Sequence, residues 1–353
     1  MATRLSHEMM EFQSDRIESV LASHRIPVRV HGGVIAPRWI RFHFSAAPSA
    51  RVSKIRNLSE EIALALGAAS ARIARDGDML AVEIPRPDAE AVRLLPLLRD
   101  LLRTSMLPPV SACIGLTDTG QPLLLRLPSP DVTHILVAGA TGSGKTELMR
   151  AMILSLVAAN RQAKVQLVLI DPKSRGFGPL GRLPHLIAPP AANVEAASAL
   201  LTRLAAEMDR RDADNATLPR IVIVVDEVID LLMTGGKPVE AALTRLAQRG
   251  REAGIHLILG AQKPSSTLLG PQLKANLPVR LVGRVGSVED ARVATGIAGS
   301  GAEKLTGRGD FIAVACGQTM RFQVAYVSPA DLTHFYAAAR DRNNLIRFEQ
   351  SFV

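Results

Sequence analysis

The stretch Gly139-Ala-Thr-Gly-Ser-Gly-Lys-Thr146 decides the fold of this chain. It satisfies the pattern G-x-x-x-x-G-K-[ST] and lies between a short apolar run, 134–138, and a segment with apolar residues at helical spacing. Its glycines allow the backbone to curl, so that successive N–H groups and the positive end of the next helix face bound phosphates. We therefore predict a phosphate loop at 139–146; a glycine-rich turn without nucleotide is the alternative.

The residues of this loop predict ATP and Mg²⁺ as ligands. Lys145 is expected to neutralise the β and γ phosphates, and Thr146 to offer its hydroxyl to Mg²⁺. We expect the whole loop to contact the nucleotide, that is Gly139, Ala140, Thr141, Gly142, Ser143, Gly144, Lys145 and Thr146.

A second element, Ile221-Val-Ile-Val-Val-Asp-Glu227, is an apolar run that ends in two acids. A buried strand of this kind delivers a carboxylate to the metal at its C-terminal end. Asp226 is expected to hold Mg²⁺, directly or through water, and Glu227 to polarise the attacking water. Adjacent acids here favour hydrolysis over transfer of the phosphoryl group to a metabolite. A chance pair of surface acids is the alternative.

Two other polar residues follow apolar runs of the same type. Gln262 follows the run 255–260 and is predicted as a sensor near the γ phosphate or its water; a polar residue that caps the strand is the alternative. Asp171 follows the run 165–170 and precedes Pro172. It either supports the site or forms a turn, and the pattern leaves both open.

The rest of the chain predicts an α/β protein with two domains. From Thr133 onward, short apolar strands alternate with helical segments, which is typical of a buried, mostly parallel sheet with crossover helices. Upstream, strands with alternating apolar residues and short helices predict a small α+β domain. The predicted strands of the later part are 134–138, 165–170, 221–225, 255–260, 279–285, 311–315 and 322–327. The predicted domains are a helical segment at 1–25, the α+β domain at 26–104, the ATPase domain at 105–340 and a C-terminal tail at 341–353.

The composition favours a nucleic-acid partner and argues against a membrane protein. The formal net charge is +9, with 42 Lys and Arg dispersed along 353 residues; a merely basic surface is the alternative. Aromatic residues make up only 3%, so backbone charge and not base stacking should dominate binding. The two cysteines, Cys113 and Cys316, lack metal-ligand spacing. No apolar run approaches the ~20 residues that cross a bilayer. We expect a cytoplasmic chain without membrane insertion.

At these motifs the chain resembles the motor region of FtsK/SpoIIIE DNA translocases, over about residues 26–335. The upstream stretches 52–59 and 62–66 are similar to the α domain of that family. The stretches that carry the resemblance beyond the phosphate loop are Leu169-Ile-Asp-Pro-Lys173, Leu183-Pro-His-Leu186, Val224-Val-Asp-Glu227, Arg249-Gly-Arg-Glu-Ala-Gly-Ile-His-Leu257, Gly260-Ala-Gln-Lys-Pro264, Leu273-Lys-Ala-Asn276 and Gly307-Arg-Gly-Asp310.

The resemblance implies RecA-like motor domains in a homo-oligomeric, hexameric ring that threads double-stranded DNA while hydrolysing ATP. Arg292 occupies the position of an arginine finger that acts on the neighbouring subunit, with Arg249 and Arg251 as alternatives. Contacts to DNA phosphates in the channel are predicted for Lys304, Arg308 and Arg321; a solvated basic surface is the alternative for each.

The sequence also departs from the family. Lys263 stands where an arginine is more usual, and the family's membrane region and its DNA-reading γ domain are not expected in this chain. The predicted function is an ATP-driven double-stranded DNA translocase that acts as a ring. The alternative is an FtsK-like ATPase of a conjugation or protein-secretion system.

Overall fold

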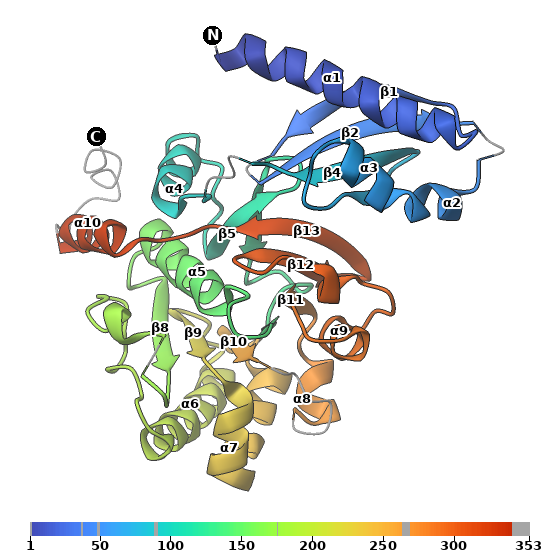
Figure 1. The fold of residues 1–353 in the computed structure, drawn as a ribbon. Helices are drawn as coiled ribbons and strands as arrows, with labels where there is room; N and C mark the ends of the chain where they lie inside the picture. The colour runs from blue at the N-terminus through green and yellow to red at the C-terminus, as the bar shows by residue number, and fades with distance from the viewer. Residues whose placement is uncertain are drawn as a thin grey trace. The chain divides into compact units, whose positions relative to one another are not determined.

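The computed structural model describes residues 2–36, 38–47, 50–87, 91–174, 176–262 and 269–340. They form two units, of which the smaller comprises Met1–Ala91 with Asp118–Gln121 and the larger comprises Val92–Thr117 with Pro122–Val353 (Figure 1). The predicted tail at 341–353 and Lys263 lie outside the described residues.

In the part of the chain that the structure describes, the smaller unit is a four-stranded antiparallel sheet with three helices. The strand order is β1-β2-β4-β3. Phe42 and Phe44 on one face of β2 are fully buried in its core, together with Ile17 and Leu21 of the first helix. The helix that we placed in a separate segment, 1–25, is therefore part of this unit. The elements are α1 (Ala2–Ser23), β1 (Val28–Ile35), β2 (Trp39–Ala46), α2 (Val52–Asn57), α3 (Ser59–Ala65), β3 (Arg72–Asp76) and β4 (Met79–Pro85).

The larger unit contains a nine-stranded sheet within the described residues, in the order β6-β5-β13-β12-β11-β7-β10-β9-β8. The five strands from β11 to β8 are parallel, and the other four are antiparallel. The predicted α/β fold, a mostly parallel core sheet preceded by a small α+β domain, is confirmed. The strands are β5 (Ser111–Thr117), β6 (Pro122–Arg126), β7 (Ile135–Ala138), β8 (Val165–Ile170), β9 (Arg220–Val225), β10 (Ile255–Ala261), β11 (Val279–Gly283), β12 (Asp310–Ala315) and β13 (Gln318–Val324).

The antiparallel part of the sheet includes a hairpin that the predicted alternation of strands and crossover helices does not indicate. Strands β12 and β13 are joined by Cys316 and Gly317, whose φ angles of 50° and 73° are both positive. Two such residues form the tight hairpin turn that matches the twist of antiparallel strands. The chain therefore reverses here instead of crossing over through a helix.

Helices cover both faces of the sheet. Val222 and Val224 of β9 pack on the side of α4, α5 and α10, whereas Ile221, Ile223 and Val225 pack on the side of α6, α7 and α8. Successive residues of a strand face opposite ways, so a strand buried on both faces is a continuous apolar run. The helices are α4 (Leu94–Arg103), α5 (Lys145–Ala159), α6 (Val194–Asp214), α7 (Val228–Arg249), α8 (Pro271–Ala275), α9 (Val288–Thr295) and α10 (Pro329–Arg340), with short 3₁₀ turns at Gly178–Leu180 and Ala302–Lys304.

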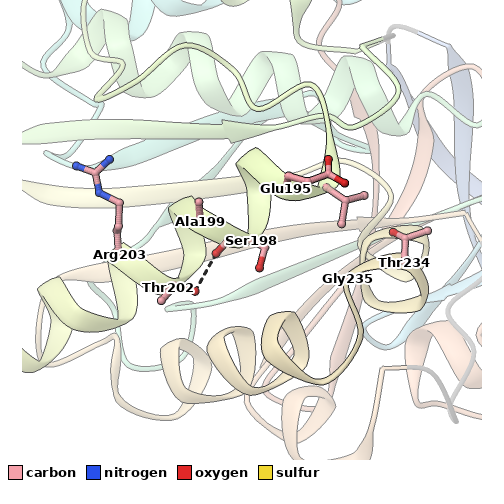
Figure 2. A pocket seen from close by; sticks show the side chains of 8 residues that line it. Glu195, Ser198, Ala199, Thr202, Arg203, Thr234 and Gly235 are labelled. Atoms are coloured by element: carbon pink, nitrogen blue, oxygen red, sulfur yellow. Dashed lines mark hydrogen bonds between the residues drawn. The ribbon is translucent and has the colours of Figure 1, made fainter.

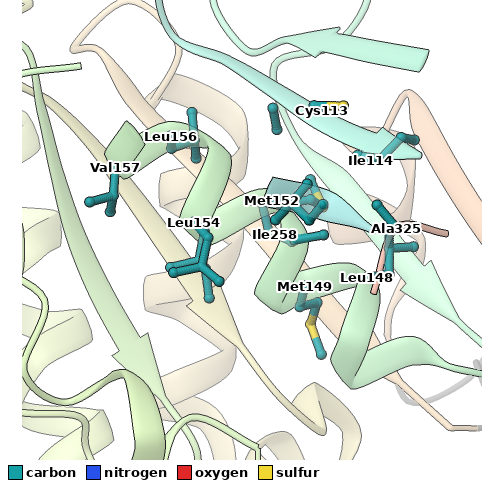
Figure 3. Packing of buried hydrophobic residues seen from close by; sticks show 14 of the residues in the cluster. Cys113, Ile114, Leu148, Met149, Met152, Leu154, Leu156, Val157, Ile258 and Ala325 are labelled. Atoms are coloured by element: carbon teal, nitrogen blue, oxygen red, sulfur yellow. The ribbon is translucent and has the colours of Figure 1, made fainter. Parts of the chain in front are cut away.

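Helix α5, which follows the predicted phosphate loop, lies in the centre of one core. Its Leu148, Met152 and Leu156 are fully buried, and its other apolar side chains pack around them with Ile114 of β5 and Ile258 of β10 (Figure 3). A helix that is apolar all round requires such surroundings. This packing fixes the helix N-terminus at the carboxyl edge of the sheet.

Helix α4 also packs in the larger unit. Leu94 and Leu98 belong to the same core as α5, and they are almost completely buried. The sequence-based boundary at 104 placed this helix with the small domain. The difference arises because the amphipathic pattern of a short helix shows which face is buried but not the partner that buries it.

No helix within the described ranges has both the length and the apolar character to cross a bilayer.

Two buried histidines lie at the amino ends of the parallel strands. Nδ1 of His134 accepts a hydrogen bond from the Leu257 N–H (3.0 Å), and Nδ1 of His256 donates to the Thr133 carbonyl (3.1 Å). Nε2 of His256 then faces Nη1 of Arg220 at 3.4 Å as an acceptor. Each ring thus uses one nitrogen as an acceptor, which protonation would remove. Burial lowers the pKa of His134 to about 4 and that of His256 to about 3.

These histidines predict a loss of stability in mild acid. In the unfolded chain they take up protons near pH 6.5, whereas in the folded chain they stay neutral down to about pH 4 and 3. The free energy of unfolding should therefore fall below pH 6.5, by up to about 1.4 kcal/mol per pH unit for each histidine. Denaturant unfolding between pH 7 and 5 measures this slope. His256→Gln should reduce it and the exposed control His334→Gln should not; equal slopes in both would contradict the assignment.

Candidate functional site

The predicted phosphate loop connects β7 to α5 and depends on two of its glycines. Gly139 and Gly144 have φ angles of 157° and 104°, in the region that favours glycine. A Cβ atom on Gly139 would lie 2.6 Å from the Ser143 Oγ, and one on Gly144 would lie 2.8 Å from the backbone nitrogen of Gly309. Side chains at these two positions would therefore open the loop.

The loop is hydrogen bonded to its neighbours on both sides. The Gly139 N–H donates to the Ala261 carbonyl at the end of β10 (3.2 Å), and the Ala140 N–H donates to the Arg284 carbonyl after β11 (2.8 Å). Ser143 has its side chain buried against Gly139 and Gly283, so only its backbone is placed to contact a phosphate. The loop is a fixed part of the sheet edge.

Lys145 lies between the two predicted acids. Its Nζ is 2.9 Å from Asp226 Oδ1 and also contacts Glu227 Oε1. All three side chains are about nine-tenths buried. Burial of three charges is costly unless they are paired, so the ammonium compensates both carboxylates here.

Glu227 has an unusual backbone conformation. Its φ and ψ of 57° and 56° are left-handed, and it forms the N-terminal boundary of α7 directly after Asp226. Residues other than glycine adopt this conformation at a cost, and such residues cluster at functional sites. The turn directs Glu227 to the same Lys145 that Asp226 contacts.

The two residues predicted to bind Mg²⁺, Thr146 and Asp226, both have side chains beside Gly176. A Cβ on Gly176 would lie 2.9 Å from Asp226 Oδ2 and 3.1 Å from Thr146 Cγ2. Oxygen ligands of this kind suit Mg²⁺, which completes its shell with water and substrate phosphates. The chain therefore offers a glycine cradle for phosphates, a lysine, and a hydroxyl–carboxylate pair that together fit ATP and Mg²⁺.

Asp171 holds the backbone at Gly176 and Phe177. Its carboxylate is buried and accepts hydrogen bonds from the N–H groups of Gly176 (2.7 Å) and Phe177 (2.9 Å). Of the two roles that the sequence left open, the turn-forming one is observed, at the edge of the site.

Arg150 also contacts the backbone at this site, and no sequence motif indicates it. Its Nε donates to the Gly176 carbonyl (2.9 Å) and its Nη1 pairs with Glu147 (2.8 Å), whose carboxyl pKa is raised by burial. Arg150 lies one turn after Thr146, but nothing in that spacing shows that its partner is a carbonyl of another loop.

The other predicted catalytic residues lie outside this cluster. Gln262 follows the last residue of β10 and is exposed. Arg292 is exposed on α9 and pairs with Glu289 on the same helix (2.6 Å). Of its alternatives, Arg251 is exposed, whereas Arg249 is engaged by Asp209 and Asp212 of α6. Their roles stay predictions.

The three predicted DNA contacts differ in structure. Lys304 and Arg308 are exposed. Arg321 instead forms two parallel contacts of 2.8 Å with the buried carboxylate of Asp310. Because this pair engages the guanidinium and buries it, we withdraw Arg321 from the predicted DNA contacts.

A shallow groove of about 560 Å³ lies elsewhere, between α6 and α7 (Figure 2). It occurs where α7 is interrupted at Gly236, whose φ and ψ are 60° and −154°. Its polar lining consists of Glu195, Ser198, Thr202, Arg203 and Thr234, and none of these belongs to the phosphate loop. None of the predicted catalytic residues lines this groove.

Comparison with known proteins gives consistent matches. The FtsK/SpoIIIE family model matches residues 109–216 and 212–266, and the FtsK alpha domain model matches residues 2–86. The chain is 31% identical to the DNA translocase SftA of Bacillus subtilis (strain 168) over 359 residues, which cover 94% of this chain and 37% of that protein. It is 35% identical to a DNA translocase FtsK of Helicobacter pylori (strain J99) over 308 residues, covering 81% and 36%. The chain thus spans little more than a third of the length of these relatives.

Solved structures share the fold. The conjugation coupling protein TcpA of pCW3, in its monomer form, superposes with a TM-score of 0.64 at 18% identity, covering 94% of this chain and 99% of that one. The cytoplasmic domain of the Type VII secretion ATPase EccC of Thermomonospora curvata gives 0.55 at 26% identity, covering 68% and 32%.

The Lys145 contacts predict the effect of removing its charge. Lys145→Ala leaves two buried carboxylates uncompensated, so we expect a loss of about 3–5 kcal/mol in the free energy of unfolding without nucleotide or Mg²⁺. Adding Glu227→Gln to Lys145→Ala removes one of these carboxylates and should restore part of the lost free energy of unfolding. Denaturant unfolding in EDTA measures the single and the double variant. The control is Lys173→Ala, which removes a half-exposed ion pair with Asp230 and should cost less than about 1 kcal/mol. Equal losses in Lys145→Ala and Lys173→Ala would contradict the assignment.

Proposed function

Because the chain belongs to the FtsK/SpoIIIE family and includes its α domain, we propose that it is a motor subunit that couples ATP hydrolysis to movement along double-stranded DNA. The observation that carries the proposal is the convergence of Lys145, Asp226 and Glu227 beside the phosphate loop. A phosphate cradle, a lysine and two acids are the parts that ATP hydrolysis by a P-loop enzyme requires.

Each residue of the site has a distinct proposed role. The loop N–H groups and Lys145 bind the β and γ phosphates, while Thr146 and Asp226 hold Mg²⁺. When bound, Mg²⁺ supplies neutralising charge to the phosphate oxygens. Glu227 accepts the proton of the attacking water, and Gln262 orients that water from the end of β10.

The contact between Lys145 and Glu227 separates binding from hydrolysis in this proposal. In the structure the Glu227 carboxylate contacts the Lys145 ammonium group. When Lys145 turns to a bound phosphate, the Glu227 carboxylate loses this partner and is free to contact the attacking water. Glu227 is then available as the general base only when nucleotide is present.

The ring and its arginine finger follow from family membership and from the exposure of Arg292. Transfer of the γ-phosphoryl group spreads negative charge over its oxygens, and an arginine from a neighbouring subunit stabilises that charge. Arg292 is exposed on α9, as a residue that acts on another subunit must be. A hexameric ring of identical subunits is the assembly that we propose.

Duplex DNA is the proposed substrate. Lys304 and Arg308 are exposed, and the chain carries a net charge of +9. Contacts from lysine and arginine to phosphates bind DNA without reading its sequence, as a motor that moves along DNA requires.

A second candidate is an ATPase of a conjugation or protein-secretion system. It is favoured by the likeness to the secretion ATPase EccC at 26% identity. A secretion motor would engage a polypeptide, so duplex DNA would not control its ATP hydrolysis. This difference separates the translocase from a secretion ATPase in one assay, whereas a conjugation motor would differ from the translocase in its partner.

We predict that long linear duplex DNA stimulates ATP hydrolysis by the purified chain. The stimulation should weaken as salt increases, because binding through phosphates releases counterions with a slope of about −0.9 per contact. Lys304→Ala should weaken binding alike on all sequences and reduce the slope by about 1. Steady-state ATPase assays at low and moderate salt measure these effects. A rate of ATP hydrolysis that duplex DNA does not change at low salt would favour the secretion function.

The same assay tests the proposed finger. Arg292→Ala should lower kcat by about 10³-fold or more while leaving the affinity for ADP unchanged, because the arginine stabilises only the transition state. Arg249→Ala is the matched control, since that side chain pairs with α6 and should have a small effect. A large loss in Arg249→Ala with normal turnover in Arg292→Ala would reassign the finger.

A further inference from the structure

We infer that the turn 307–309, together with Arg321 and Gln323 of β13, positions the peptide groups of the phosphate loop for nucleotide. The inference rests on the proposal that this loop binds nucleotide. The turn directly precedes β12. Arg321 and Gln323 lie on β13, the strand that pairs with β12.

The turn is hydrogen bonded directly to the phosphate loop. The Arg308 N–H donates to the Gly142 carbonyl (3.0 Å), and the Gly309 N–H donates to the Ser143 carbonyl (2.7 Å). In a trans peptide the carbonyl and the next N–H point in opposite directions. A carbonyl of Ser143 that faces the turn therefore directs the Gly144 N–H away from it, so the turn sets the direction of a group that phosphates need.

The approach of turn and loop is close enough to exclude side chains. A Cβ on Gly144 would lie 2.8 Å from the Gly309 nitrogen, and one on Gly307 would lie 3.3 Å from the Gly142 carbonyl. The three residues of the turn have positive φ angles of 77°, 50° and 90°. Arg308, the middle one, adopts this conformation at a cost and needs support from its surroundings.

Strand β13 and Asp310 provide that support. Arg321 pairs through Nε and Nη2 with the two oxygens of Asp310, at 2.8 Å each, and Asp310 also accepts from the Thr306 N–H (2.9 Å). Gln323 donates from Nε2 to the Arg308 carbonyl (3.1 Å). Bidentate pairs between arginine and carboxylate fix geometry as well as charge. The contacts thus run from β13 through the turn to the loop.

Arg321 is therefore a positioning residue. A misdirected loop N–H weakens phosphate binding in the ground state and in the transition state alike. Loss of such uniform binding raises KM and the ADP dissociation constant while leaving kcat nearly unchanged. A general loss of stability would not produce this split.

The test compares two buried arginines of the larger unit by calorimetric titration with Mg-ADP, without DNA. Arg321→Gln should weaken Mg-ADP binding by about tenfold, and Arg321→Lys, which keeps the charge, should recover part of the affinity. The matched control is Arg211→Gln. Arg211 is also largely buried, with 3% of its side chain exposed against 9% for Arg321, and it pairs with Glu207 (2.8 Å). It also donates to the carbonyls of Pro219 (2.8 Å) and Ala253 (3.1 Å), which do not belong to the loop. That control should lose stability and keep the wild-type affinity.

Two outcomes would overturn the inference: wild-type affinity in Arg321→Gln, or an equal loss of affinity in Arg211→Gln. If Arg321→Gln does not fold, Gln323→Leu replaces it, since it removes an uncharged bond to the turn; about threefold weaker binding is expected, and unchanged binding would overturn the inference. If the chain binds Mg-ADP but duplex DNA does not stimulate its ATP hydrolysis, the proposed translocase function is contradicted and this inference still stands. A wild-type chain that does not bind Mg-ADP would contradict both.

Discussion

The contact of Lys145 with Asp226 and Glu227 is the interaction on which the arrangement of the site depends. It joins the first residue of α5 to the two residues that follow β9, two elements that are far apart in sequence. Buried carboxylates without a cation would be expensive, so the lysine compensates them within the fold. The lysine is also the group that a phosphate would attract, so the same charges that stabilise the site prepare it to exchange partners on binding nucleotide.

The architecture brings these charges together in two ways. Parallel strands end at one edge of the sheet, so β7, β9 and β10 deliver their following residues to the same place. Glycines then provide room there, since a Cβ on Gly260 would lie 3.2 Å from Asp226 Oδ1. The antiparallel strands contribute from the other side, because β12 and β13 carry Asp310 and Arg321, which support the turn against the loop. Both halves of the sheet therefore shape one site.

Much of this could be predicted from the sequence, and the exceptions share a cause. The glycine-rich loop after β7 and the Asp226–Glu227 pair after β9 follow from local patterns, a strand followed by a special turn, and in the structure each follows its strand at the expected residues. The reversal at Cys316 and the packing of α4 depend on which partner an element finds, which a local pattern does not show. Arg321 was predicted to bind DNA because its charge is visible in the sequence, whereas its buried partner Asp310 becomes apparent only when β12 and β13 pair.

The most direct test of the account is the hydrolysis of ATP by Glu227→Gln. The substitution keeps the size of the side chain and removes its ability to accept a proton. Single-turnover measurements with Mg-ATP, together with its dissociation constant, separate binding from chemistry. The account predicts an affinity close to that of the wild type and a rate of hydrolysis about 10²- to 10⁴-fold lower. Hydrolysis at the wild-type rate would show that Glu227 is not the base and would contradict the central claim.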